Sequence, residues 1–357
     1  MSLTDLLNSN YVEWMNADNG PETDIVISSR IRLARNLSLM PFPHLLDDDS
    51  GPKVLSEIKE AWSKNIDKYA DFQLITFDQL PSLDREILVE KHLISPEHGK
   101  SDKNFQGLLV NNNGSIAIMI NEEDHLRLQC ILPGLQIEQC YALAQKFDDQ
   151  LEEYLDFAFD ERRGYLTSCP TNVGTGMRAS VMLHLPALSI TGHTNHIFQN
   201  LGQLGMTVRG LYGENSEMLG NFFQLSNQVT LGQAEEDILN NLTIIVTQII
   251  EQERLMRSKL VGETKLQLED RVGRAYGILT NAKIMTSSEA LKHLSDVRLG
   301  VDMKILSNIK PFALNQLVVA LKPAHLQKVT GQEMGAMDRD ILRAGVIKKK
   351  IVKNREV

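Results

Sequence analysis

Hydrophobic residues alternate with a two-residue period in several stretches of the first two-thirds of the chain. In the clearest stretch, Ile116, Ile118 and Ile120 are separated by Ala117 and Met119, so both faces of the strand are apolar. A strand that is apolar on both faces belongs in the middle of a sheet. The polar residues that begin at position 121 should therefore follow the end of a central strand.

The same region alternates between strand-like and helix-like segments. This alternation predicts a region of mixed α and β structure. We expect strands at 24–28, 115–120, 206–212 and 222–229.

After Ala234 the hydrophobic spacing changes to that of a helix. Acidic residues stand in the first turn, where the helix dipole favours them, and apolar residues recur every three to four positions. The residues concerned are Glu235, Glu236 and Asp237, then Ile238, Leu242, Ile245 and Ile249. This predicts a long amphipathic helix.

The rest of the chain is predicted to be mostly helical. Turns are expected near Gly262, Gly300, Pro311, Pro323 and Gly331. We place a domain boundary near residue 255, which gives three parts: an N-terminal segment 1–23, a catalytic domain 24–254 and a helical C-terminal domain 255–357.

Composition narrows the functional classes. The 357 residues are 42% hydrophobic, which suffices for a large core, and no run approaches the roughly 20 apolar residues that cross a membrane. The start lacks a signal peptide, so we expect a cytoplasmic protein. The net charge of 37 − 46 = −9 argues against direct binding of nucleic acid. The spacing of Cys130, Cys140 and Cys169 suggests neither a disulfide framework nor a zinc site.

Five polar clusters carry the candidate chemistry, and several have ordinary structural interpretations. Arg30 and Arg32 alternate along a strand, which fits a solvated sheet edge as well as a phosphate clamp. The acidic run 122–124 fits an acidic turn, His92 fits a surface or core histidine, and Cys169 fits an inert thiol. The clusters are residues 28–32, 121–127, 169–180, 209–214 and 339–344.

The combination of clusters is more specific than any one of them. Five arginines follow strand-like or glycine-containing segments, and such cations would repel one another unless they shared a polyanion. The phosphates of ATP meet that need, because planar guanidinium groups stabilise the charge of a transferring phosphoryl group. These arginines are Arg30, Arg32, Arg127, Arg178 and Arg209.

Two glutamates suggest the acceptor. Glu123 and Glu214 stand at the ends of separate predicted strands, and two carboxylates can hold one planar cation. A guanidinium is such a cation, and it becomes a nucleophile only when a carboxylate orients it and helps remove a proton. The sequence therefore indicates phosphoryl transfer to a guanidinium.

At these residues the chain resembles the phosphagen (guanidino) kinases. The segment Cys169–Ser180 reproduces their CPTN and GTG-x-RAS signature, and the segments at 28–32, 121–127 and 209–214 match in order, so the resemblance covers about residues 24–254. It implies an α+β fold, with an antiparallel sheet flanked by helices and followed by the helical C-terminal domain. It also implies ATP and Mg²⁺, the metal being bound mainly by phosphates and water rather than by a protein cage.

The resemblance implies roles for individual residues. Glu123 and Glu214 grip the acceptor, Cys169 lies beside it, and Glu122 either binds the acceptor too or organises the water around the metal. The nucleotide-binding residues implied are Ser28, Ser29, Arg30, Ile31, Arg32, His92, Arg127, Arg178, Ala179, Ser180, Val181, Met182, Arg209, Gly210, Leu211, Tyr212, Gly213 and Glu214.

Two departures from the phosphagen kinases resemble the bacterial protein-arginine kinases. Ser28 stands only 27 residues from the start, without the helical domain that closes over small substrates, and a C-terminal region is added. That region carries the subfamily's Arg-Asp-x-x-Arg-Ala motif at Arg339, Asp340, Ile341, Leu342, Arg343 and Ala344. Arg339 and Arg343 lie four apart, so the motif fits an allosteric phosphoarginine site or an ordinary charged helix surface.

The resemblance also implies partners. These are protein substrates with accessible arginines, a zinc-finger activator, a heat-shock repressor, a Clp chaperone–protease and a second copy of the chain, in a stress response that marks proteins for degradation. Two other functions stay open. A small-molecule arginine or creatine kinase would use the same phosphate clamp, and an adaptor that only binds phosphoarginine would not need both Glu123 and Glu214.

Overall fold

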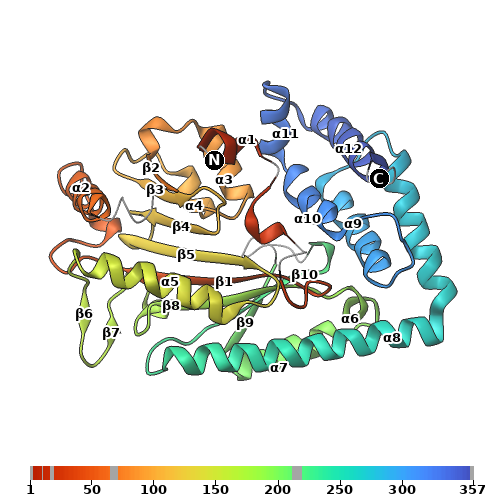
Figure 1. Ribbon diagram of the computed structural model, residues 1–357, viewed down its shortest axis with the longest axis horizontal. Coiled ribbons are helices and arrows are strands. Elements are labelled where there is room, and N and C mark those ends of the chain that lie inside the picture. The colour runs from red at the N-terminus through yellow and green to blue at the C-terminus, as the bar shows by residue number, and fades with distance from the viewer. Residues whose placement is uncertain (1–2, 10, 17–19, 65–70, 211–218, 354–357) are drawn as a thin grey trace.

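The computed structural model describes residues 3–9, 11–16, 20–64, 71–210 and 219–353. Within these residues one antiparallel sheet of eight strands forms the centre of the molecule (Figure 1). From edge to edge its strands are β2 (Phe72–Thr76), β3 (Gly107–Asn111), β4 (Ile116–Ile120), β5 (Leu126–Pro133), β1 (Val26–Arg35), β8 (Met177–His184), β10 (Phe222–Asn227) and β9 (Met206–Arg209).

Helices and short connections surround this sheet. A separate hairpin pairs β6 (Phe159–Asp160) with β7 (Gly164–Tyr165). The helices are α1 (Leu3–Asn8), α2 (Ser50–Ser63), α3 (Ser82–Glu90), α4 (Pro96–Lys100), α5 (Ile137–Glu152), α6 (Pro186–Ile190), α7 (Thr194–Gln203), α8 (Glu235–Asn281), α9 (Ser287–Asp302), α10 (Pro311–Ala320), α11 (Pro323–Thr330) and α12 (Ala336–Lys353). The 3-10 turns are η1 (Glu13–Met15), η3 (Pro43–Leu45), η5 (Phe77–Gln79), η6 (Pro170–Asn172) and η7 (Leu219–Asn221).

The predicted strands occur, although their bounds differ. Strand β4 is buried at all five positions and lies between β3 and β5, which confirms its central place. Strand β1 is longer than the segment 24–28 and lies between β5 and β8. Arg30 and Arg32 are therefore in the middle of the sheet, and the interpretation of a solvated sheet edge is wrong.

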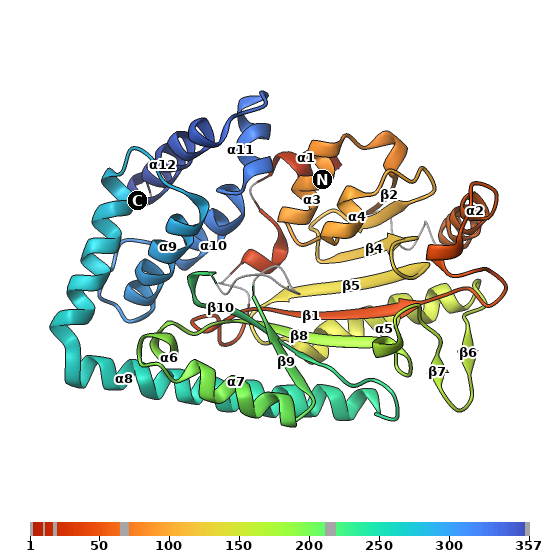
Figure 2. The ribbon, with the colours of Figure 1, turned by 180° about the vertical axis from the view of Figure 1, so that it is seen from behind.

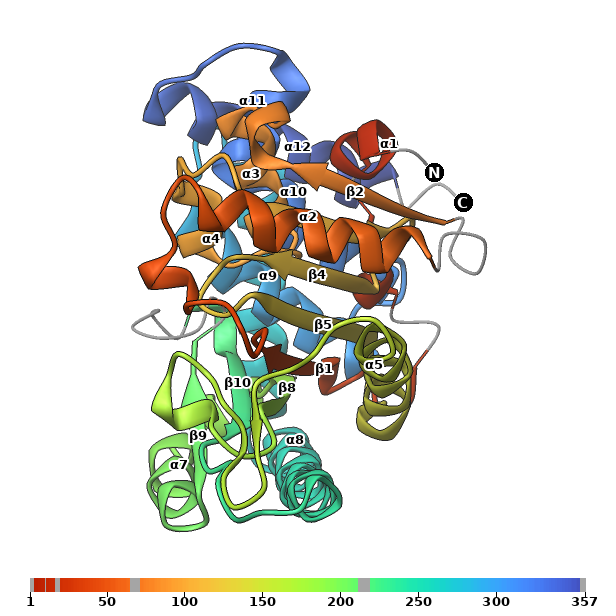
Figure 3. The ribbon, with the colours of Figure 1, turned by 90° about the vertical axis from the view of Figure 1, so that its left-hand side faces the viewer.

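The alternation of β1 separates core residues from polar ones. Ile31 and Leu33 join the hydrophobic cluster that packs the sheet against α2, α5 and α8. Figure 3 shows α5 and α8 running beside the strands on this side. Because successive side chains of a strand point to opposite faces, Arg30 and Arg32 share the other face. That face is covered in part by the N-terminal segment, α3 and residues of α10 and α11.

Helix α8 joins the sheet to the helical C-terminal region. Figures 1 and 2 show it passing beneath the sheet and then bending upward beside α9 and α12. The bend coincides with Thr264, whose backbone is not helical (φ −136°, ψ 37°). A boundary near residue 255 falls within this helix, so the division into domains stays a prediction. No helix in the described parts of the chain is long and apolar enough to cross a membrane.

Two of the turns expected in the helical region lie two residues beyond the glycine that predicted them: α8 is kinked at Thr264, and α9 ends at Asp302. Gly300 lies inside α9, where a Cβ atom would stand 2.4 Å from Val272 Cγ1 of α8, so this glycine serves close helix packing. The other three turns are confirmed: Pro311 and Pro323 begin α10 and α11, and Gly331 ends α11 with φ 67°.

Candidate active site

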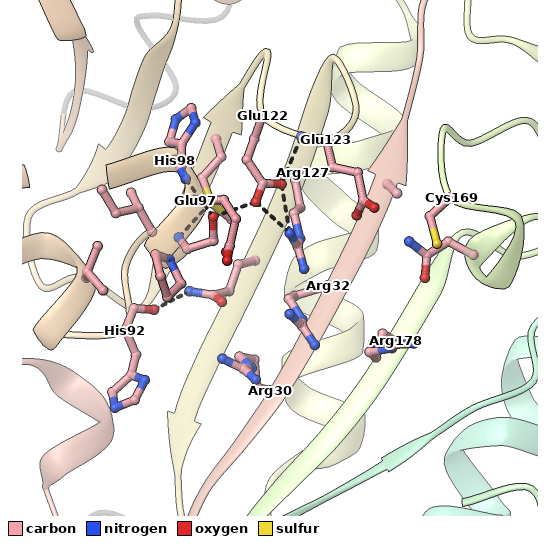
Figure 4. Close-up of a pocket in the computed structure, with 18 of the residues that line it drawn as sticks. Arg30, Arg32, His92, Glu97, His98, Glu122, Glu123, Arg127, Cys169 and Arg178 are labelled. Atoms are coloured by element: carbon pink, nitrogen blue, oxygen red, sulfur yellow. Dashed lines mark hydrogen bonds and ion pairs between the residues drawn. The ribbon is translucent and has the colours of Figure 1, made fainter. Parts of the chain in front are cut away.

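Arginine side chains from four strands line one cavity of about 810 Å³ (Figure 4). Arg30 and Arg32 come from β1, Arg127 from β5, Arg178 from β8 and Arg209 from the end of β9. The register places Arg32 directly opposite Arg178 across the β1–β8 ladder. Like charges in such a pair destabilise a sheet, so this arrangement indicates a site built for an anion.

The electrostatics of the cluster support the same conclusion. Desolvation, followed by the charges of Arg127, Arg178 and Arg209, lowers the pKa of Arg30 to about 10. Desolvation, followed by the charges of Arg30, Arg127 and Arg178, lowers the pKa of Arg32 well below its usual value, against the opposing charge of Glu122. Within the described residues the buried Nε of Arg32 has no hydrogen-bond partner. A polyphosphate would supply both the missing acceptor and the opposite charge.

Arg30 is positioned by two residues, only one of which the motifs revealed. Its Nη2 donates to Gln224 Oε1 of β10 at 2.7 Å, and its Nε lies 3.4 Å from Ser180 Oγ of β8. Ser180 belongs to the predicted set, whereas Gln224 does not. The position of Gln224 along the sequence gives no signal, because it faces Arg30 only through strand pairing.

Glu122 is committed to the arginine cluster. Its two carboxylate oxygens accept from Arg127 Nη1 at 2.8 and 2.7 Å, and it also accepts from the Ser95 hydroxyl. Burial alone would raise its pKa, but the charge of Arg127 and these hydrogen bonds outweigh burial and lower the pKa to about 2. Glu122 is therefore an ionised partner that fixes Arg127.

Glu123 lies at a different part of the cavity, with Cys169 facing it (Figure 4). Its side chain is exposed at the rim. Desolvation, with smaller contributions from Asp124 and Glu122, raises its pKa against the opposing charges of Arg127 and Arg178. A carboxylate with a raised pKa is suited to accept a proton.

Cys169 stands at the start of the turn η6, and its Sγ lies 3.0 Å from Thr171 Oγ1. The thiol is neither deeply buried nor disulfide-bonded, which removes the interpretation of an inert core cysteine. Further along the same loop, Gly176 has φ 63°, and a Cβ there would stand 2.7 Å from the Ala34 carbonyl oxygen. Glycine thus allows the loop that begins at Cys169 to lie against β1.

The side chains of Asp124 and Asn36 hold two loops of the candidate site together. Asp124 Oδ1 accepts from Asn36 Nδ2 at 2.6 Å and from the backbone amide of Ser168 at 2.7 Å. Asn36 Oδ1 in turn accepts from the amide of His125 at 2.9 Å. These bonds fix the acidic turn beside the loop of Cys169. Sequence reasoning missed these supporting roles, because nothing in the run 121–127 separates structural from chemical members.

His92 lines the cavity at the end away from Cys169 (Figure 4). Its backbone is left-handed (φ 61°), and its ring packs edge-on against Trp14 with centroids 5.4 Å apart. Burial, and then the charges of Arg30 and Lys322, lower its pKa to about 3, so the imidazole is neutral at physiological pH. A neutral ring is compatible with a nucleoside beside it.

The structure does not bring every predicted nucleotide-binding residue to the cavity. Ile31, Ala179 and Val181 point into the core on the opposite face, as the alternation of their strands requires. The Ser29 hydroxyl donates to the Gly134 carbonyl at 2.8 Å on that same side. Ser28 and Met182 line a smaller void next to the cavity.

Part of the predicted site falls outside the described residues. This applies to Leu211, Tyr212, Gly213 and the second proposed acceptor ligand, Glu214. Gly210 is described and is buried at the end of β9.

The C-terminal motif lies on α12, away from this cavity. Arg343 is buried and donates to the carbonyl oxygens of Leu321 and Met285, each at 2.9 Å, and to the Asp340 carboxylate. Arg339 Nη1 donates to the Met334 carbonyl at 2.6 Å. The motif is therefore partly folded into the helical region, unlike a fully solvated charged surface.

The donor set around the cavity bears on the expected Mg²⁺. Among the described residues no group of three or more His, Cys, Asp or Glu side chains is placed to hold a metal ion. Glu122, one of the carboxylates that line the cavity, is already paired with Arg127. These residues fit an ion that arrives with the nucleotide and is held mainly by phosphate oxygens and water.

Comparisons with known proteins cover the whole chain. The model of the ATP:guanido phosphotransferase, C-terminal catalytic domain, matches residues 53–256, and that of the protein-arginine kinase McsB C-terminal domain matches residues 265–356. A protein-arginine kinase of Syntrophomonas wolfei is 60% identical over 100% of this chain and 99% of its own. A protein-arginine kinase of Halothermothrix orenii is 51% identical over 98% of this chain and 99% of its own.

Solved structures show the same fold. Lombricine kinase matches with a TM-score of 0.59 and 22% identity over 71% of this chain and 73% of its own. The duplicated taurocyamine kinase of Schistosoma mansoni matches with a TM-score of 0.60 and 26% identity over 66% of this chain and 34% of its own. The chain belongs to the ATP:guanido phosphotransferases, which confirms the resemblance read from the motifs. Within that family, the chain belongs to the protein-arginine kinases.

Proposed function

We propose that this protein transfers the γ-phosphoryl group of ATP to arginine side chains of other proteins. The observation that carries the proposal is the division of one cavity into two parts. A cluster of five arginines lines one part of it, and Glu123 and Cys169 stand at one end. The first part suits a polyphosphate and the second suits a guanidinium.

The reaction needs little covalent chemistry from the protein. A terminal nitrogen of the acceptor arginine attacks the γ-phosphorus, the N–P bond forms, and the bond from the γ-phosphorus to the bridging oxygen of ADP breaks. Glu123 orients the guanidinium and takes the proton that the nitrogen loses. The arginines stabilise the charge of the transferring group, and Glu122 keeps Arg127 in place for that task.

The role of Mg²⁺ follows from the same division. When bound with ATP, it neutralises phosphate charge and orients the γ-phosphoryl group. The chain's own contribution is to present guanidinium donors in fixed positions, because strand pairing and Glu122 limit their movement.

We also propose that the motif at 339–344 binds phosphoarginine as a regulatory ligand. Such a ligand carries a phosphoryl group and a guanidinium, so it can replace Asp340 as the partner of Arg343 and offer its own cation to Asp340. From the family we further propose a cytoplasmic location, a homodimer, a zinc-finger activator, a heat-shock repressor and a Clp chaperone–protease as partners.

The test is mass spectrometry of a basic, unfolded protein after incubation with this chain, ATP and Mg²⁺. Sample handling stays near neutral pH because N–P bonds are acid-labile. We expect phosphoarginine in the substrate protein, little release of ADP with free arginine, and loss of the label with Glu123→Gln. Rapid, saturable ADP release with free arginine and no protein label would instead indicate a small-molecule guanidino kinase. Binding of phosphoarginine with no ADP release would indicate an adaptor.

A further inference from the structure

A second, smaller void adjoins the arginine-lined cavity. The two share Arg30, His92 and Gln224 in their walls, so they are neighbours. The smaller one has a volume of about 20 Å³, which is room for about one water molecule. Its remaining wall is mostly apolar and aromatic and includes Met182 and Phe222.

The direction of the nucleotide in the large cavity points to this void. The γ-phosphoryl group has to face Glu123 and Cys169, and Arg30 and Arg32 lie between that end and His92 (Figure 4). The nucleoside therefore leaves the clamp at the His92 end, where the void begins. An apolar, aromatic wall with a few polar groups suits a planar heteroaromatic base.

The outer wall of the void comes from the helical C-terminal region. Asn315 and Val318 of α10 both line it. Asn315 is buried and bridges two parts of the molecule, because its Oδ1 accepts from Arg298 Nη1 of α9 at 2.7 Å and its Nδ2 donates to the Met15 carbonyl at 3.0 Å. Arg298 also donates to the Thr23 carbonyl at 2.6 Å.

The N-terminal segment connects this bridge to the nucleotide end of the cavity. Next to Met15, the indole of Trp14 packs edge-on against His92 and donates its Nε1 proton to the Lys91 carbonyl at 3.1 Å. A continuous series of contacts thus runs from α9 through Asn315 and Trp14 to His92. Any movement of α10 changes the wall against which a base would pack.

We propose that α10 is the movable wall of the nucleobase site, so that nucleotide binding and the position of the helical region are linked. The proposal rests on the nucleotide site proposed above. A purine ring is much larger than one water molecule, and a close-packed interior does not admit it unless a wall moves. Because linkage is reciprocal, a ligand or partner that moves the helical region changes nucleotide affinity by the same factor.

The first test separates the base from the phosphates. Tripolyphosphate fills the arginine cluster without a nucleoside, whereas ADP brings one. The chain has two tryptophans, so Trp62→Phe leaves Trp14 as the reporter of the void. We expect ADP to change Trp14 emission and the hydrogen exchange of the α10 amides, and tripolyphosphate to bind without either change. Equal responses to the two ligands, or ADP binding with no response in α10, would overturn the proposal.

The second test uses adjacent valines of α10. Val318 lines the void, whereas Val319, although equally part of the core, does not. Val318→Ala gives the base more room, so ADP should bind more tightly, on the order of fivefold, the lower end of typical couplings between linked sites. Tripolyphosphate affinity should stay unchanged, and Val319→Ala should alter neither affinity.

The outcomes distinguish this inference from the proposed function. The proposal that α10 is a movable wall is contradicted if Val318→Ala binds ADP with unchanged or weaker affinity. It is also contradicted if both valine variants shift the ADP affinity equally, even when arginine phosphorylation is intact. Failure of the wild-type chain to bind ADP or to phosphorylate arginine contradicts the proposed function itself. If Val318→Ala fails to fold, the comparison of ADP with tripolyphosphate on the Trp62→Phe chain still decides the question.

Discussion

The neighbouring residues Glu122 and Glu123 give the sharpest prediction, because substituting one should lower stability and substituting the other should lower the reaction rate. Glu122→Gln keeps the size of the side chain and removes the charge that pairs with Arg127. The Glu122 side chain is only 6% exposed, so solvent does little to replace that charge. The variant leaves Arg127 among other cations with its main counter-charge gone.

The magnitude follows from the pKa of Glu122. A carboxyl group whose pKa falls from 4.5 to about 2 on folding stabilises the folded state by about 3 kcal/mol at neutral pH, since each pH unit corresponds to about 1.4 kcal/mol. Because the folded pKa is the lower one, this contribution is complete above pH 4.5 and is lost as the pH falls from 4.5 towards 2. Removing one partner of a buried pair typically costs a similar amount, about 3–5 kcal/mol.

Urea unfolding at several pH values measures this effect. At pH 7 we expect Glu122→Gln to lower the free energy of unfolding by about 3 kcal/mol, and at pH 3 the difference from wild type should shrink to about half or less. Added ADP should raise the free energy of unfolding of wild type more than that of the variant, because Arg127 is misplaced in the variant.

Glu123→Gln is the matched control. The folded pKa of Glu123 is raised, so ionisation of this group does not favour folding, and the variant should be no less stable than wild type at pH 7. Its rate of arginine phosphorylation should fall by about 10²–10⁴. Equal destabilisation by the two variants, or a Glu122→Gln chain with wild-type stability at every pH, would refute the division of roles between these residues.

Three further predictions concern other parts of the chain. Gly300→Ala should lower thermal stability, and Val272→Ala should restore it in the double variant, because the new methyl group meets the valine. Arg178→Gln removes the cation that stands opposite Arg32 across the β1–β8 ladder, so calorimetry should show weaker ADP binding. Arg343→Ala and Asp340→Ala should abolish activation by added phosphoarginine while ADP binding stays near normal. Unchanged activation in both would reduce the motif to part of the packing of the helical region.

Much of the candidate site could be predicted from the sequence, because its residues follow local patterns. Alternation along β1 places Arg30 and Arg32 on one face whatever the rest of the fold does. The ordered segments at 28–32, 121–127 and 169–180 identified the family before any contact was known. Five of the predicted arginines do line one cavity.

The different roles of Glu122 and Glu123 could not be predicted from the sequence. The two are neighbours of the same type, and their roles differ because Ser95 and Arg127, from other segments, reach Glu122 only in the folded chain. The glycine signals at Gly262 and Gly300 stand two residues before the kink of α8 and the end of α9. Gly300 also allows α9 to pack closely against Val272 of α8, which only the folded chain shows.

By itself, the sequence determined which residues carry charge, which face of each strand they occupy, and the family to which they point. Only the tertiary structure decided that β1 is central, that Glu122 pairs with Arg127, and that α10 lines the void beside His92. The physical reason is distance along the chain. Periodicity and capping act between residues a few positions apart, whereas the contact of Asn315 with Met15 joins residues 300 positions apart and exists only once the core has formed.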